Sequence, residues 1–262
     1  IEAEYKTLLS HCFDIWLKRV MQVLGHQFML SRTLLGSPSV TVNQDTQGEG
    51  DKNLTKIIDY LENIRKNINT GGLPQEVAST IISNILSCID YTCFNDLLNK
   101  FHNLSWKTGV RIDQNINEII EWREAHPILG VVENEPLPLL KQISKLLQLR
   151  ISSVYDINFV IEVCHSLNVT QIQTILKKYK PTEYEPHMSS DVLNYLSNLI
   201  KKIGRAKETV TFSEDTKTLP DPFKVFKELS VPPSPVAAHA LFEIIDLAKV
   251  TPVVHKIITI AQ

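Results

Sequence analysis

Motifs that carry common enzyme chemistry are missing from this sequence of 262 residues. Its 9 glycines are nowhere spaced as GxGxxG or GxxxxGK[ST], the loops whose backbone amides bind phosphate groups. Its 8 histidines are never four residues apart, so the HExxH pattern of helix-borne zinc sites is also missing. We therefore expect no bound nucleotide, no metal and no other cofactor.

The 4 cysteines lack the spacing of a metal site, because no CxxC pair occurs. Each lies in an apolar helical stretch, which predicts reduced core thiols of a cytosolic protein. Cys164 and His165 come closest to a nucleophile and its base. Adjacent helical residues point about 100° apart, so we expect a buried cysteine beside a surface histidine. The sequence thus predicts no catalytic residue and no enzyme.

Strong charge and long apolar runs are missing too. The formal net charge is −2 and the pI is near 6.5, which argues against direct binding of nucleic acid over the whole surface. No uninterrupted apolar run of about 18 residues is present, so we expect no membrane insertion. The chain begins at Ile1 rather than at Met, and we expect it to be a fragment of a longer protein.

What the sequence does contain is apolar residues recurring every three or four positions, which is typical of amphipathic helices. These stripes cover 5–24, 54–68, 77–101, 112–120, 139–147 and 192–203, and Ser153, Asn168 and Ser190 are placed to cap further helix starts. The predicted fold class is all-α, an elongated antiparallel bundle of about 8–10 helices with an extended C-terminal segment.

Breaks in this pattern predict the domain organisation. We expect one helical module over 1–262, with a mobile loop at 36–52 where glycine, proline and polar residues interrupt the stripes. Residues 206–235 carry several prolines and predict an extended connector. Residues 236–262 predict a C-terminal helix and a tail that could be helix or strand.

Two clusters of basic residues lie near predicted helix ends. One comprises Lys177, Lys178 and Lys180, and the other includes Lys201 and Lys202. Cations at a helix C-terminus are favoured by the helix dipole, so both clusters could be solvated helix ends. They could also converge on a surface for an acidic protein or anionic lipid. The sequence alone leaves both interpretations open.

Three short stretches, taken together and in order, resemble a known family. They are Cys93–Leu98 (CFNDLL), Leu104–Gly109 (LSWKTG) and Asn115–Trp122 (NINEIIEW). They resemble the core of the dilute domain in the globular tail of class V myosins. A later Asp221–Phe223 (DPF) is similar to a motif of fungal members, and the resemblance covers roughly 75–230. Thr108 departs from the family pattern, where a basic residue is common.

The resemblance implies a cargo-binding tail of an actin-based motor. Its expected partners are cargo adaptors: a Rab GTPase, an organelle receptor, or an adaptor that carries messenger RNA. We expect a cytoplasmic protein associated with actin and its cargo. The fragment is expected to be a monomer, and the full motor a dimer through a coiled coil. Alternatives are the same domain in a junctional scaffold, an α-solenoid adaptor, and an unrecognised helical enzyme.

For a docking surface, the sequence favours the polar turn between two buried helices and the start of the helix after it, namely Lys107, Thr108, Arg111 and Gln114. The competing interpretation is that Trp106 anchors this turn in the core and the turn only connects helices. The second choice is the set of helix-end lysines, Lys177, Lys178, Lys201 and Lys202.

Overall fold

The structure is a computed structural model that describes residues 2–36, 45–70, 75–126, 135–181 and 188–203. Within these ranges the chain forms nine α-helices. They are α1 (Glu2–Gln27), α2 (Leu30–Leu35), α3 (Asp45–Thr70), α4 (Gln75–Lys100), α5 (Trp106–Glu124), α6 (Pro138–Gln148), α7 (Val154–Val163), α8 (Val169–Lys177) and α9 (Ser190–Ile203).

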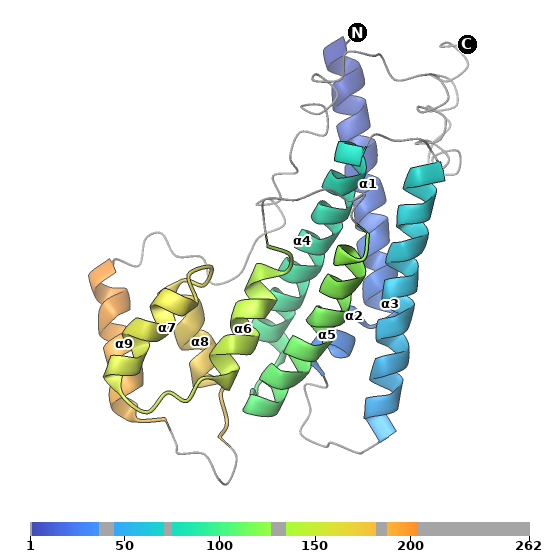
Figure 1. Cartoon of the computed structure of the whole chain (residues 1–262). Helices are drawn as coiled ribbons and strands as arrows, with labels where there is room; N and C mark the ends of the chain where they lie inside the picture. The colour runs from blue at the N-terminus through green and yellow to red at the C-terminus, as the bar shows by residue number, and fades with distance from the viewer. Residues whose placement is uncertain (1, 37–44, 71–74, 127–134, 182–187, 204–262) are drawn as a thin grey trace, which may run out of the picture.

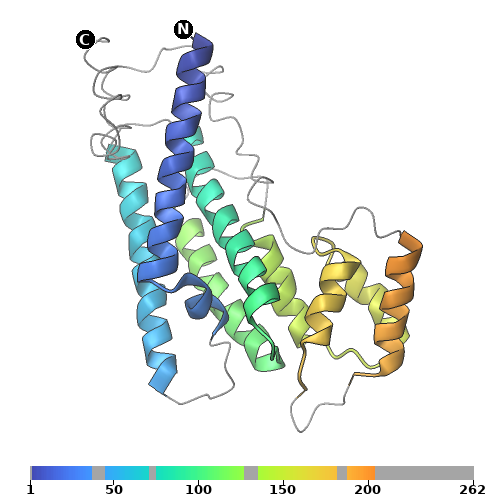
Figure 2. The same ribbon diagram turned by 180° about the vertical axis from the view of Figure 1, so that it is seen from behind.

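The long helices form an elongated antiparallel array (Figure 1). α4 packs against α1 and α3, while the short α2 lies at one end of the array and contacts all four of its long helices. Seen from behind, α1 and α4 run beside each other with α2 near their base (Figure 2). α6 packs on α5 and α4 and leads to a smaller lobe of α7, α8 and α9. The predicted all-α bundle is confirmed.

Helix starts follow from local hydrogen bonding. The predicted capping boxes at Ser153 and Asn168 are both present, with Asp156 and Gln171 bonding back to the cap residues. Ser190 is predicted to cap a further helix, but it is the first residue of α9. The hydroxyl of Ser189 accepts the Asp191 N–H instead, at 3.2 Å. The cap is thus one residue earlier than predicted.

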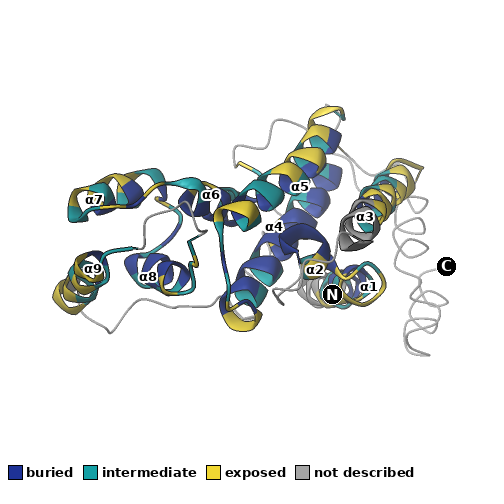
Figure 3. Cartoon of the chain, turned by 90° about the horizontal axis from the view of Figure 1, so that it is seen from below, coloured by how far each residue is buried: buried dark blue, intermediate teal, exposed yellow. Residues whose placement is uncertain are grey.

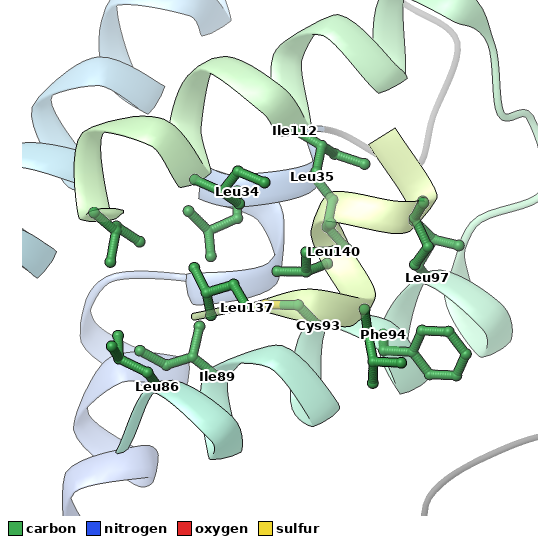
Figure 4. Close-up of a cluster of buried hydrophobic side chains, with 14 of the residues drawn as sticks. Leu34, Leu35, Leu86, Ile89, Cys93, Phe94, Leu97, Ile112, Leu137 and Leu140 are labelled. Carbon is green, nitrogen blue, oxygen red and sulfur yellow. The ribbon is translucent and has the colours of Figure 1, made fainter. Parts of the chain in front are cut away.

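The core lies where α2, α4, α5 and α6 meet. Side chains of these four helices point toward one another in Figure 4, among them Leu34, Phe94, Ile112 and Leu140, each fully buried. Figure 3 shows α4 buried along most of its length, whereas the outer helices bury one face. By length and composition α4 could also cross a membrane, but 67% of its apolar window is buried inside the bundle, as in the core helix of a soluble fold.

The predicted loop at 36–52 is too long. Helix α3 begins at Asp45 and includes Gly48 and Gly50, while 37–44 lie outside the described residues. A glycine costs a helix about 1 kcal/mol relative to alanine but does not end it. The predicted segments at 206–235 and 236–262 also lie outside the described residues.

Candidate functional site

The predicted docking turn is the first turn of a helix rather than a loop. Ser105 is the N-cap of α5, and its backbone N–H donates to Thr108 Oγ1 at 3.3 Å while the Thr108 N–H donates to Ser105 Oγ at 3.4 Å. This reciprocal capping box explains why the chain turns directly into α5. Thr108, predicted as a contact residue, therefore serves to start the helix.

Two further features hold this helix start in place. Leu104 is fully buried, and its N–H and C=O bond to Lys178 O and Lys180 N across an isolated parallel bridge, at 2.9 and 2.7 Å. Gly109 lets α6 come close, because a Cβ at that position would lie 2.9 Å from Leu147 Cβ. The glycine of the LSWKTG stretch is thus needed for the contact between α5 and α6.

Of the predicted contact residues on α5, two are accessible. Lys107 and Gln114 are exposed, and Arg111 lies between them on the same face because the three are spaced four and three residues apart. Arg111 is only half-exposed. Its Nη1 would lie 2.6 Å from a Cβ on Gly36, so the side chain packs against the C-cap of α2.

Trp106 does not anchor the helix start in the core. Its side chain is 46% exposed, which contradicts the competing interpretation from the sequence. The anchoring residues are the buried Leu104 before it and the buried Phe101, which directly follows α4. An exposed indole next to Lys107 is instead a feature common in protein interfaces, where tryptophan is enriched.

The bridge brings the helix-end lysines of α8 to the start of α5. Lys177 is exposed and its Nζ donates to Gln173 Oε1 at 3.1 Å. Lys178 is half-buried and its Nζ donates to Leu98 O at the end of α4, and burial lowers its pKa. Lys178 therefore joins α8 to α4, and the prediction that it belongs to the docking surface is not supported by this geometry.

Lys201 and Lys202 lie at the opposite end of the small lobe. α8 and α9 pack side by side and run antiparallel, so the last turn of α9 is far from Lys177 (Figure 1). With a rise of 1.5 Å per residue, the 12 steps from Ser190 to Lys202 span about 18 Å. The two lysine clusters do not converge.

The third stretch that resembles the family, Asn115–Trp122, also has a structural role, because its side chains join α5 to α2 and α3. Asn115 donates to the carbonyls of Thr33 and Leu34, both at 3.0 Å, and so satisfies the C-terminal end of α2. Trp122 Nε1 donates to Glu62 on α3 at 3.2 Å. Hydrogen bonds from Arg65, together with that of Trp122, hold the pKa of Glu62 down to about 2.

A buried carboxyl on α4 was missed by the sequence reasoning. Asp90 is 1% exposed and accepts the N–H groups of Leu139 and Leu140, at 3.0 and 2.9 Å, at the start of α6. Burial raises its pKa to about 7, although the two amide hydrogen bonds lower it. The signal was available, since Asp90 falls on the apolar stripe of Leu86 and Cys93.

Among the described residues, neither a metal site nor an activated cysteine is found. Within them, no three His, Cys, Asp or Glu side chains are grouped as a metal site requires. All four cysteines are buried and outside disulfides, and burial raises the pKa of Cys164 to about 11. Such thiols are poor nucleophiles near neutral pH. Cys164 Sγ donates to Gln142 O, while His165 lies exposed near the Gln142 amide, so the two side chains do not pair.

The family model of the DIL domain matches residues 80–183, which include the end of α4, the bridge and the start of α5. The chain carries a DIL domain of the class V myosin type. Curated relatives of this DIL chain include Myosin-2A of Naumovozyma castellii, 28% identical over 87% of the chain, and Myosin-4 of Saccharomyces cerevisiae, 30% identical over 77%. The chain spans only 15% and 13% of these relatives. The resemblance to fungal class V tails is confirmed.

Solved globular tails have the same fold. Apo Myo2-GTD is 25% identical with a TM-score of 0.66, over 89% of this DIL chain and 59% of that one. Myo2-GTD has also been solved in complex with Mmr1, at 24% identity, a TM-score of 0.69, and 98% and 62% coverage. A further match is the complex of the carboxy-terminal domain of Myo4p with a middle fragment of She3p, at 23% identity, a TM-score of 0.62, and 87% and 53% coverage. These structural similarities are all to globular tails.

Proposed function

We propose that this DIL chain is the cargo-docking part of an actin-based class V myosin. It would hold an adaptor through protein–protein contacts: a Rab GTPase, an organelle receptor, or an adaptor that carries messenger RNA. The complexes of related tails with Mmr1 and She3p support a protein partner. We place the protein in the cytoplasm on actin-borne cargo, and we expect RNA to be bound only by the adaptor, since the chain has a net charge of −2.

The observation that carries the proposal is a rigid but accessible helix start. Leu104, Ser105 and Gly109 fix the first turn of α5 through the bridge, the capping box and the contact with α6. Lys107 and Gln114 still face solvent on that helix. A preorganised surface loses little conformational entropy on binding, which favours affinity. A junctional scaffold is less favoured, because the relatives named above are myosins.

An affinity pulldown from cytosolic extract tests this proposal. The whole chain serves as bait beside a Lys107→Glu, Gln114→Glu variant, and bound proteins are identified by mass spectrometry. We expect a vesicle GTPase, organelle receptor or RNA adaptor that the variant loses.

The matched control is Lys201→Glu, Lys202→Glu at the far end of α9, where both side chains are also exposed. If this control loses the partner and the α5 variant keeps it, the docking surface is on α9 and the assignment to α5 is wrong. Recovery of junctional proteins alone would contradict the myosin function.

A further inference from the structure

The bridge between Leu104 and Tyr179 joins two segments that are more than 70 residues apart in sequence. One segment, 98–108, connects α4 to α5, and the other, 173–181, ends α8. Two backbone hydrogen bonds, Leu104 N to Lys178 O and Lys180 N to Leu104 O, fix the segments side by side. Side chains from both therefore share one end of the molecule.

This shared end is basic. Neither 98–108 nor 173–181 contains an aspartate or glutamate, whereas together they contain five lysines and a histidine. Three of these lysines already have partners within the chain, since Lys100 pairs with Asp96 at 2.8 Å, Lys178 bonds Leu98 O, and Lys177 bonds Gln173 Oε1 at 3.1 Å. Lys107, Lys177 and Lys180 are exposed, and none forms an ion pair with the described part of the chain. The N-terminus of α5 adds the positive end of its dipole.

An apolar group lies within the same end. The side chain of Trp106 is 46% exposed, one residue before Lys107 in the first turn of α5. Tryptophan supplies a large rigid surface at low entropic cost and is frequent among residues that dominate binding energy. We call Trp106, Lys107, Lys177 and Lys180 the bridge patch.

We infer that the bridge patch binds an acidic segment of a protein partner. Carboxylates of the segment pair with Lys107, Lys177 and Lys180, and an apolar side chain packs on the Trp106 indole. This inference rests on the proposed function and adds the chemistry of the partner. Charge complementarity supports it, because the patch is positive on a chain whose net charge is −2.

A protein segment fits better than a membrane. Recognition of anionic lipid usually takes a cluster of about four to eight basic residues, and the bridge patch exposes three lysines. A single partly exposed tryptophan within a folded helix start is also a small apolar contribution compared with a membrane-binding helix. A short acidic peptide needs only a few matched charges and one apolar contact.

Peptide display with the whole chain as bait tests the inference. We expect the enriched peptides to share acidic residues around one aliphatic or aromatic residue. The affinity of a synthetic copy should fall as salt rises, because exposed charges are screened. Lys107→Glu, Lys180→Glu should weaken that peptide at least about tenfold, since two attractive charges become repulsive. Trp106→Ala should weaken binding but keep the salt dependence.

The control is Lys201→Glu, Lys202→Glu, which makes the same charge change on α9 and should leave the peptide affinity unchanged. Thermal unfolding by circular dichroism checks that all variants fold. Enrichment of peptides without acidic residues, or equal loss in both variants, overturns the inference. Binding of phosphatidylserine vesicles that the bridge-patch variant alone loses would assign the patch to lipid instead.

The two proposals fail in distinguishable ways. If the partner captured in the pulldown survives Lys107→Glu, Lys180→Glu, the bridge patch is not its docking surface and this inference is wrong, while the cargo-docking function stands. If the whole chain captures no adaptor but still binds acidic peptides through the patch, the inference stands and the proposed function is wrong.

Discussion

Asp90 is a carboxyl group buried in the core, and burial raises its pKa to about 7. Its carboxyl group comes from α4 and caps the start of α6 by accepting the N–H groups of Leu139 and Leu140. The residue before that helix, Leu137, has a positive φ of 53° and makes no side-chain cap. The orphan amides of α6 thus depend on a side chain 49 residues away in sequence.

The raised pKa of Asp90 predicts a pH-dependent stability. Its folded pKa of about 7 lies above the usual 3.8, so its stabilising contribution is full below about pH 4 and is lost as pH rises through 7. Relative to Asp90→Asn, the wild type should lose about 3 kcal/mol of unfolding free energy between pH 5 and pH 8, out of about 4 kcal/mol over the whole interval. Urea denaturation at pH 5 and pH 8 measures this.

Comparison with the Asp90→Asn variant cancels the contributions that other titrating groups make to the pH dependence of stability, because both proteins contain those groups. Glu62, whose pKa is lowered to about 2, adds stability above its usual 4.5 that is lost only as the pH falls toward 2. The Glu62 carboxyl group is therefore mostly ionised between pH 5 and pH 8 in both the folded and the unfolded protein. Parallel pH profiles for the two proteins would show that Asp90 is ionised without penalty and would contradict the prediction.

At the scale of the helices, α5 and α6 approach each other closely at Gly109. A Cβ on Gly109 would lie 2.9 Å from Leu147 Cβ and 3.0 Å from the backbone oxygen of Ser144. The backbone oxygen cannot rotate away, so a side chain there must push the helices apart. We expect Gly109→Ala to destabilise the chain by about 1–3 kcal/mol, measured by urea denaturation.

Gly25 on α1 provides the matched control. It is exposed, and a Cβ there would meet nothing within 4 Å. Alanine is the better helix former by about 1 kcal/mol, so Gly25→Ala should stabilise the chain. If both substitutions stabilised the chain, helix propensity would dominate and the contact between α5 and α6 would not require glycine.

Helix positions could be predicted from the sequence where local periodicity decides them. The stripe of Leu54, Ile57 and Leu61 located α3, and the reciprocal pairs at Ser153 and Asn168 located the starts of α7 and α8. The start of α3 at Asp45 was missed because polar residues and glycine carry no apolar period. Local patterns thus identify a helix better than they identify its ends.

The candidate site was only partly predictable, because tertiary pairing assembles it. Lys107 and Lys177 were both proposed as contact residues, but no local pattern shows that Leu104 pairs with the chain at Tyr179. The same pairing turns Lys178 inward. Likewise, the exposure of Trp106 depends on Leu104 occupying the core in its place. Such choices between neighbouring side chains are made by packing, which a single sequence does not reveal.

The whole molecule divides into a thick bundle and a thinner lobe. α4 is surrounded by α1, α2, α3 and α6, whereas α9 contacts α7 and α8 within the described part of the chain. Among the residues described in α9, Val192 and Leu196 are fully buried. Local opening requires less free energy where fewer apolar groups become exposed. The lobe should therefore open more readily than the bundle.

Hydrogen exchange followed by mass spectrometry tests this difference. We expect amides of α9 to exchange well before those of α4, whose protection should approach that of global unfolding. Gln173→Ala removes the hydrogen bonds from α8 to Leu193 O and Ser197 Oγ, at 3.3 and 2.7 Å, so it should speed exchange in α9 and leave α4 unchanged. Equal protection of α4 and α9 in the wild type, or acceleration of both by Gln173→Ala, would mean that bundle and lobe unfold as one cooperative unit. In that case the bridge at Leu104 couples the bundle to the lobe more strongly than the contacts between their helices indicate. The lysines of α8 would then stay beside α5 for as long as the protein remains folded.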